Sequence, residues 1–187
     1  MDIAIITCAW DRSTRLPHKN LLKLNGKPLI RHTVDFAKAL GFPYYVFTPD
    51  DSIKDVCKDC AIIHEPDEML DQDIMPQLRY MHKLIHAEYY ILLQPTSPIR
   101  SGPLYARWIQ TGFDRHIAFA TSVYQNSLTY TVNGAFYWFN RAMVLEADNI
   151  RENYKYAHLW VDDQGVDIDT EKDFKKAVKY YADKNNS

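Results

Sequence analysis

Short apolar runs alternate with amphipathic stretches along this chain, and the alternation limits what the chain can fold into. Five runs have the length and the β-branched or aromatic content of buried strands, over residues 3–8, 44–47, 61–63, 89–93 and 117–124. Apolar residues at helical spacing lie between them, over 29–40, 52–60, 74–86 and 104–109. Strand-like and helix-like segments in this order are typical of a layered α/β fold.

Two Asn-Gly steps mark expected turns. Asn25-Gly26 comes shortly before Pro28, which is placed to open the helix that follows. Asn133-Gly134 lies between two strand-like runs, over 128–132 and 135–139, and therefore predicts a β-hairpin. Beyond it we expect a short helix, a strand, the end of a short strand and a final helix, over residues 141–147, 156–161, 166–169 and 170–181.

Composition and charge fit a single soluble domain covering residues 1–187. The chain is 47% apolar and 25% charged, and its formal net charge of −2 argues against a nucleic-acid partner. The three cysteines, Cys8, Cys57 and Cys60, make no disulfide framework, which favours a reducing compartment. No signal peptide and no apolar run of about 20 residues is visible, so we expect a cytoplasmic protein without a membrane partner.

A cationic loop follows the first predicted strand. Residues 11–20 contain three fixed cations, Arg12, Arg15 and Lys19, together with His18. In an open α/β sheet, the loop that leaves the carboxyl end of a strand is where ligands bind. A cationic loop in that place predicts an anionic ligand, most simply a nucleotide phosphate, and the alternative is a solvated basic turn.

Near the C-terminus, Asp167 and Asp169 form an Asp-x-Asp pair. On an extended segment, side chains two residues apart point to the same face. Two carboxylates on one face can hold Mg²⁺, which prefers oxygen ligands and often shares them with a substrate phosphate. The alternative is helix capping, since Thr170 and Asp173 approximate a capping box at the start of the last helix. The two roles are compatible.

Other common site motifs are absent. The chain contains no P-loop and no G-x-G-x-x-G, and no serine sits in a G-x-S-x-G elbow. Cys57 and Cys60 near His64 lack a second pair at metal-ligand spacing, so we interpret these cysteines as core residues. His82 and His86 have helical spacing, but no glutamate between them serves as a general base, unlike in metalloproteases.

Four segments together resemble the cytidylyltransferases that activate sugar acids, namely the acylneuraminate (CMP-sialic acid) and CMP-Kdo synthetases. The first runs from Ser13-Thr14-Arg15-Leu16-Pro17-His18-Lys19-Asn20 on to Asn25-Gly26-Lys27-Pro28-Leu29-Ile30. The second is Leu92-Leu93-Gln94-Pro95-Thr96-Ser97-Pro98-Ile99-Arg100. The third and fourth are Asn133-Gly134-Ala135-Phe136-Tyr137 and Val166-Asp167-Ile168-Asp169-Thr170-Glu171-Lys172-Asp173-Phe174. They occur in the order that the family has.

The resemblance implies a three-layer α/β/α nucleotide-diphospho-sugar transferase fold, Rossmann-like, with a mixed and mainly parallel sheet. It also implies transfer of CMP from CTP to the anomeric hydroxyl of a sugar acid of the nonulosonic kind, with release of pyrophosphate. Lys19 and Arg15 would then be catalytic, and Asp167 and Asp169 would hold Mg²⁺. The implied nucleotide-binding residues are Trp10, Arg12, Ser13, Asn20 and Gln94, and the implied substrate-binding residues are Thr96, Ser97 and Asn133.

The chain departs from the family pattern at three places. Trp10 stands where the family has an arginine, and Arg12 is a candidate for the missing cation, while Trp10 is a candidate for stacking on a base. Glu65 replaces the arginine of an Arg-Pro step. The longer insertion expected between residues 124 and 133, which contributes to dimerisation and to the sugar pocket, is absent, so a homodimer is only a possible assembly. Two alternatives stay open: another nucleotide or an acceptor such as an alditol phosphate, and a non-catalytic nucleotide-binding module.

Overall fold

The computed structural model describes residues 2–69, 73–125, 129–154, 157–162 and 166–185. Within these residues, seven strands form one mixed sheet: β1 (Ile3–Cys8), β4 (Tyr44–Thr48), β5 (Ala61–His64), β6 (Tyr89–Leu92), β7 (Phe119–Gln125), β8 (Tyr130–Asn140) and β9 (His158–Val161). Two further strands, β2 (Lys23–Leu24) and β3 (Lys27–Pro28), form a small hairpin. The turn of this hairpin is Asn25-Gly26, both with positive φ, and Pro28 then opens the next helix as predicted.

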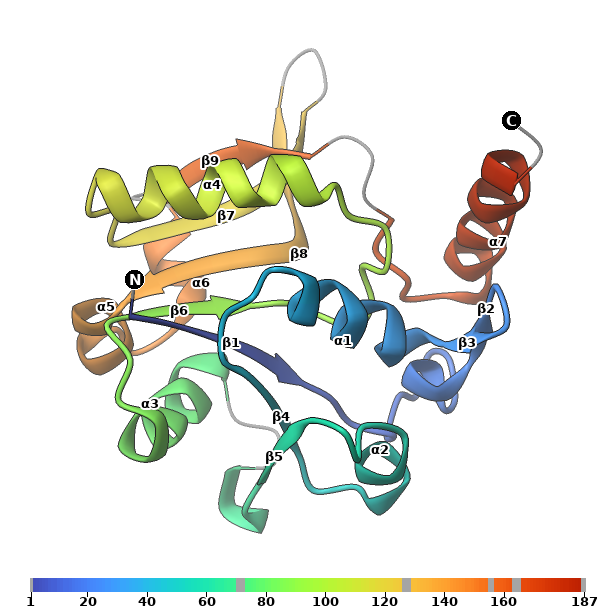
Figure 1. Cartoon of the computed structure of the whole chain (residues 1–187), viewed down its shortest axis with the longest axis horizontal. Helices are drawn as coiled ribbons and strands as arrows, with labels where there is room; N and C mark the ends of the chain where they lie inside the picture. Colours follow the sequence, from blue (N-terminus) through green and yellow to red (C-terminus); the bar gives the residue numbers. More distant parts are fainter. Residues whose placement is uncertain (1, 70–72, 126–128, 155–156, 163–165, 186–187) are drawn as a thin grey trace.

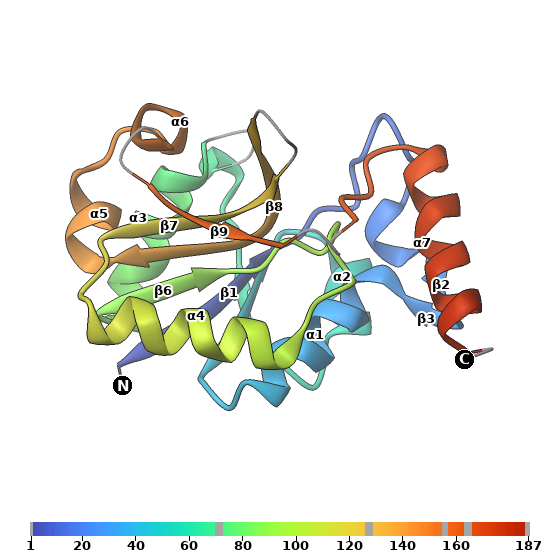
Figure 2. The same ribbon diagram turned by 90° about the horizontal axis from the view of Figure 1, so that it is seen from above.

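Helices cover both faces of the sheet (Figures 1 and 2). They are α1 (Leu29–Ala39), α2 (Asp51–Val56), α3 (Ile74–Ile85), α4 (Gly102–Asp114), α5 (Arg141–Glu146), α6 (Ile150–Asn153) and α7 (Glu171–Asn185), with 3-10 turns η1 (Lys19–Leu21) and η2 (Asp67–Met69). None of these helices is both long and apolar enough to span a bilayer.

Strand residues alternate between two buried cores, one on each face of the sheet. Ile3 and Ile5 pack with α1, α2 and α4, whereas Ala4 and Ile6 pack with α3, α5 and α6. A third, smaller cluster lies between α7 and the β2–β3 hairpin, which stand beside each other beyond the sheet in Figure 2. The predicted three-layer α/β/α architecture is therefore confirmed.

The order of strands in the sheet is β5-β4-β1-β6-β8-β7-β9. In the described residues, β8 alone runs against the other six strands, so the sheet is mixed and mainly parallel, as expected. From β1 the chain proceeds to β4 and β5 on one side and then returns to β6 on the other side. The order of strands thus reverses between β1 and β6, and the carboxyl ends of these two strands form the crevice where open α/β sheets bind ligands.

The hairpin predicted at Asn133-Gly134 is wrong, because one continuous strand, β8, runs through this step. The step forms a bulge, with register Thr121↔Tyr137 on one side and Val123↔Val132 on the other. Ser122 explains the difference from Asn25-Gly26. Its hydroxyl donates to Asn133 Oδ1 at 2.5 Å and accepts from Phe136 N at 2.9 Å, so it replaces the lost strand pairing.

Near the C-terminus, the segment 166–169 differs from the prediction, whereas the start of α7 agrees with it. Residues 166–169 are not the end of a strand. A hydrogen bond from Ile168 N to Thr96 O at 2.8 Å contributes to holding them beside the loop after β6. The capping box is confirmed, with Thr170 N donating to Asp173 Oδ2 at 3.1 Å and Asp173 N to Thr170 Oγ1 at 3.3 Å. The first residues of two predicted strands, 128 and 156, lie outside the described residues.

Gly134 offers a test of the bulge. Its φ is +70°, and a Cβ there would fall well inside van der Waals contact with Gln94 Oε1. Gly41 has the same kind of backbone, with φ +77°, but open space around it. We expect Gly41→Ala to lower the free energy of unfolding by about 1 kcal/mol and Gly134→Ala by about 2 kcal/mol or more, measured by urea denaturation. Equal losses would mean that the bulge tolerates a side chain.

Candidate active site

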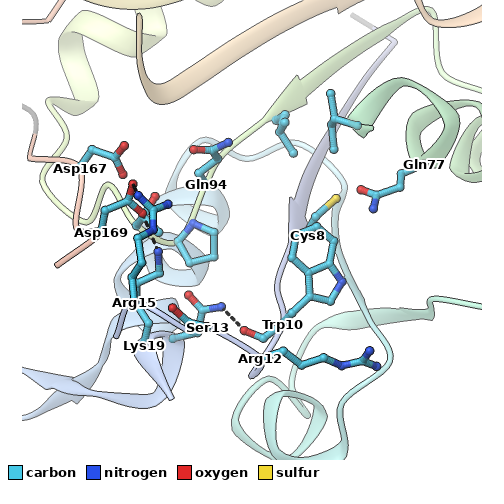
Figure 3. Close-up of a pocket in the computed structure, with 15 residues that line it drawn as sticks. Cys8, Trp10, Arg12, Ser13, Arg15, Lys19, Gln77, Gln94, Asp167 and Asp169 are labelled. Atoms are coloured by element: carbon cyan, nitrogen blue, oxygen red, sulfur yellow. Dashed lines mark hydrogen bonds and ion pairs between the residues drawn. The ribbon is translucent and has the colours of Figure 1, made fainter. Parts of the chain in front are cut away.

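A cavity of about 550 Å³ opens at the carboxyl ends of β1 and β6. It is lined by ten of the twelve residues predicted for the site: Trp10, Arg12, Ser13, Arg15, Lys19, Asn20, Gln94, Thr96, Asp167 and Asp169. Figure 3 shows that the cavity has two ends. Lys19, Arg15 and the two aspartates gather at one end, and Trp10, Cys8 and Gln77 lie at the other.

At the charged end, Asp169 binds two cations of the basic loop. Lys19 Nζ lies 2.9 Å from Asp169 Oδ1, and Arg15 Nη1 lies 2.9 Å from Asp169 Oδ2. The Lys19 side chain is only 13% exposed, whereas that of Arg15 is 67% exposed. Because Thr170 and Asp173 cap α7, the Asp169 carboxylate is left for these cations. The basic loop is therefore part of a charged pocket rather than a solvated turn.

Asp167 has a different environment from Asp169. Burial raises the pKa of its carboxyl above the ordinary value, a hydrogen bond with Thr96 acts in the opposite direction, and the nearby Asp169 charge raises the pKa further. Among the described residues, no group donates a hydrogen bond to its buried Oδ1 atom. An unpartnered buried oxygen beside a second carboxylate suits a hard divalent cation, because Mg²⁺ is commonly bound by one or two carboxylates plus substrate phosphates.

The described residues contain no group of three or more histidine, cysteine, aspartate or glutamate side chains that would make a self-sufficient metal cage. A cation bound by Asp167 and Asp169 would therefore need oxygens from a ligand to complete its shell. Such a pair fits a site where metal and phosphate bind together.

The rest of the basic loop is fixed by short-range contacts. Ser13 Oγ accepts from Leu16 N at 3.4 Å, and buried Asn20 donates to the backbone oxygen of Trp10 at 2.7 Å. Arg12 lies on the Trp10 side of the cavity, away from the aspartates (Figure 3). His18 does not line the cavity and instead lies 3.1 Å from an oxygen of Asp11.

Trp10 and Glu65, where the family resemblance implies arginine, are in contact with each other. The indole Nε1 of Trp10 donates a hydrogen bond to Glu65 Oε2, and Gln77 Nε2 donates to Glu65 Oε1 at 3.1 Å. Glu65 and Gln77 are fully buried. Two departures from the family pattern are thus one hydrogen-bonded unit, which ties β1 to the segment after β5 and to α3.

Apolar groups complete that end of the cavity. Cys8 lies beside Trp10 (Figure 3), and Ile74 and Leu92 also line the cavity. Burial raises the pKa of the Cys8 thiol far above its ordinary value, and Glu65 raises it further, so the thiol is neutral at physiological pH. The cavity therefore combines an end where cations and carboxylates are paired with an end that offers the flat Trp10 ring, a neutral thiol and the Arg12 side chain.

Gln94 is held between these ends by a partly buried cation, Arg100. Arg100 donates to Gln94 O at 2.6 Å, to Ala135 O in the bulge at 3.2 Å and to Thr33 Oγ1 in α1 at 3.0 Å. All three contacts are to neutral oxygens. Arg100 thereby fixes the loop after β6 against the bulge of β8, and Gly134 leaves room there for the Gln94 carboxamide.

Ser97 and Asn133, two of the predicted substrate-binding residues, do not line the cavity. They are 1% and 2% exposed, and their polar atoms are used inside the protein. Ser97 Oγ donates to Asn133 O at 3.5 Å, and Asn133 Nδ2 donates to Asp162 O at 3.2 Å. The geometry gives both a structural role, and contact with a substrate stays a prediction.

Sequence reasoning did not single out Gln77, Cys8, Ile74 or Leu92 for the site. A signal for Gln77 existed, because residues 74, 77, 78 and 81 share one face of a helix at i, i+3, i+4 and i+7 spacing. The apolar stretch predicted over 74–86 also contains Leu84, but Leu84 is 57% exposed, while Gln77 is buried. A polar side chain at a core position of a helix is the signal that indicates a site residue.

Comparison with known proteins gives one family and several related folds. The family model described as "Cytidylyltransferase" matches residues 3–186. An N-acylneuraminate cytidylyltransferase of Streptococcus agalactiae serotype V is 23% identical over 204 residues, covering 87% of this chain and 49% of that protein. The chain thus spans about half the length of this curated relative.

Solved structures share the fold across nearly their whole length. A CMP:2-keto-3-deoxy-manno-octonic acid synthetase complexed with CTP has a TM-score of 0.81 at 17% identity, covering 98% of this chain and 100% of that one. The Mycobacterium tuberculosis H37Rv protein Rv0371C, in complex with manganese, has a TM-score of 0.69 at 18% identity, covering 96% and 99%. At these identities the likeness establishes the fold alone.

Asp167 offers a test of the charged end in the metal-free protein. Because its pKa is raised in the folded state, its charge destabilises folding at pH values above that pKa, and the penalty vanishes at pH values below its unfolded pKa. Asp167→Asn should therefore raise the free energy of unfolding at pH 7 in EDTA, and the gain should fade toward pH 4 and below, near the ordinary carboxyl pKa of about 3.9.

Asp169→Asn is the matched comparison, since it removes a carboxylate that has two cationic partners. It should leave the free energy of unfolding unchanged or lower it. A less stable Asp167→Asn protein at pH 7 would contradict the unfavourable burial of that charge.

Proposed function

The chain belongs to the cytidylyltransferase family, and from that premise we propose that it transfers CMP from CTP to the anomeric hydroxyl of a sugar acid, releasing pyrophosphate. One observation carries this proposal. Lys19, Arg15 and the aspartate pair, which come from opposite ends of the sequence, meet in one cavity at the strand-order reversal. An anionic ligand with a divalent cation is what such a cavity suits.

The charges support a role for each group in the reaction. Lys19 and Arg15 would neutralise the triphosphate, and Ser13 and Asn20 would hydrogen-bond it. Phosphoryl transfer depends on charge neutralisation and on in-line positioning more than on covalent chemistry. The sugar hydroxyl would attack the α-phosphorus, the bond to the bridging oxygen would break, and the cations would stabilise the charge that builds on the pyrophosphate leaving group.

The metal would be Mg²⁺, bound by Asp167 and Asp169, and it would supply charge neutralisation at the phosphates. The manganese complex of Rv0371C, a protein of the same fold, is in keeping with use of a divalent cation. In the free protein, Asp169 is paired with Lys19 and Arg15. Binding of the metal and the nucleotide would exchange these pairs, with carboxylates facing metal and cations facing phosphate.

The two ends of the cavity also support an orientation. The base would lie at the Trp10 and Cys8 end, and the triphosphate would run toward Lys19. Gln94 lies between the two ends (Figure 3), where the ribose and the sugar acid would meet. Thr96 hydrogen-bonds with Asp167 at the charged end. The acceptor would be an acid of the nonulosonic kind, bound by a single domain without the insertion that acylneuraminate enzymes carry between the positions of residues 124 and 133.

Pyrophosphate release with CTP, Mg²⁺ and a panel of sugar acids tests the proposal. Activity with at least one acid is expected, and Lys19→Met and Asp169→Asn should each lower kcat by about 100-fold or more, as loss of a positioned charge does. Lys58→Met is the matched control. Lys58 is an exposed lysine that follows α2, so its loss should leave kcat unchanged.

Three other outcomes have distinct meanings. Release of pyrophosphate with UTP or GTP in preference to CTP would favour a nucleotidyltransferase that uses another nucleotide. Release of pyrophosphate with an alditol phosphate would identify that compound, and not a sugar acid, as the acceptor. Saturable CTP binding by calorimetry without any release would favour a non-catalytic nucleotide-binding module.

A further inference from the structure

We propose that Gln77, oriented by Glu65 and Trp10, reads the base of the nucleotide and selects one that presents an amino group, as cytosine does, over one that presents a carbonyl oxygen, as uracil does. This inference rests on the proposed function, because it assigns the base to the Trp10 end of the cavity. It makes Glu65 and Trp10 positioning residues.

The first step is the direction of the Gln77 carboxamide. Its Nε2 donates to Glu65 Oε1 at 3.1 Å and to the backbone oxygen of Met69 at 3.5 Å. A backbone carbonyl is an acceptor, and an ionised carboxylate offers only acceptor atoms. Turning the amide over would place Gln77 Oε1 against both of these oxygens, with no proton between them. The chemistry of its neighbours therefore fixes which atom of Gln77 is which.

The second step is what fixes Glu65. An indole nitrogen is a donor only, so Trp10 Nε1 can hold one oxygen of Glu65 and cannot be reversed. The other oxygen is then left for Gln77. The chain of contacts runs in one direction, from Trp10 to Glu65 to Gln77, and each proton position follows from the one before.

The third step is the atom left over. Gln77 is fully buried and lines the cavity, and its Oε1 has no hydrogen-bond partner in the part of the chain that the structure describes. Figure 3 shows the Gln77 carboxamide facing the cavity beyond Cys8 and Trp10. A buried acceptor without a partner costs free energy in the empty protein, and a ligand that donates to it removes that cost.

Base chemistry completes the argument. The exocyclic amino group of cytosine donates, whereas uracil carries a carbonyl oxygen at the same ring position. Gln77 Oε1 would accept from the amino group but would face the carbonyl oxygen of uracil without a proton. A site built around one buried hydrogen bond rejects the analogue that lacks it.

The test compares Kd for CTP and for UTP, each with Mg²⁺, by calorimetry on the full chain. The native protein should bind CTP about 10- to 100-fold more tightly than UTP, the range for one buried hydrogen bond. Gln77→Met, which keeps the volume, should bring the two Kd values within about threefold, mainly by weakening CTP binding. Gln110→Met, at an exposed position of α4, is the matched control and should keep the native ratio.

Glu65→Gln tests the orienting step. The Trp10 indole would hold the new amide oxygen and turn its nitrogen toward Gln77, so Gln77 would have to accept there and present its own nitrogen to the base. The preference should then move from CTP toward UTP although Gln77 is unchanged. Each result is a ratio within one protein, so a lower folded fraction in a variant does not alter it.

Failure has two separable forms. Pyrophosphate release with equal binding of CTP and UTP by the native protein would overturn the base reading and leave the proposed function standing. A native ratio retained in both Gln77→Met and Glu65→Gln would do the same. If no nucleotide binds to the native protein, the proposed function and this inference both fail.

Discussion

The ion pairs of Asp169 with Lys19 and Arg15 are the interaction on which the rest of the site depends. They join the loop after β1 to the segment before α7, with Lys19 and Asp169 150 residues apart in sequence. Without a ligand, the cations in the cavity would repel one another if they were unpaired, and so would the carboxylates. Paired, they stabilise each other, and they leave both kinds of group in place for a ligand that carries phosphates and a divalent cation.

The scaffold holds this pocket rigidly through buried polar contacts rather than through apolar packing alone. Ser122 ties down the bulge of β8, and Arg100 joins that bulge to the loop that carries Gln94. At the opposite end, Glu65 joins Trp10 to Gln77. Buried groups of this kind fix a unique geometry when each finds its partners. Four buried side-chain atoms of the described residues have no hydrogen-bond partner, and two of them, Asp167 Oδ1 and Gln77 Oε1, lie where the proposed metal and base would bind.

Much of the fold could be predicted because apolar periodicity reports burial directly, as for residues 29–40 and the helix α1. The Asn133-Gly134 step could not, since a hairpin and a bulge accept the same dipeptide, and Ser122, eleven positions away, decides between them. The charged end of the site followed from the residue types and the family resemblance. At the other end Trp10 was predicted, but its contact with Glu65 was not, because the two residues are 55 positions apart and meet only in three dimensions.

In the proposed reaction the cavity positions a nucleotide for attack at its α-phosphorus. Phosphorus NMR of the protein with CTP, Mg²⁺ and a sugar acid shows which bond breaks. We predict that the three triphosphate signals give way to a phosphodiester signal and to pyrophosphate. Appearance of a nucleoside diphosphate with inorganic phosphate would place the attack at the γ-phosphorus and contradict the account, as would an unchanged triphosphate with every acid tried.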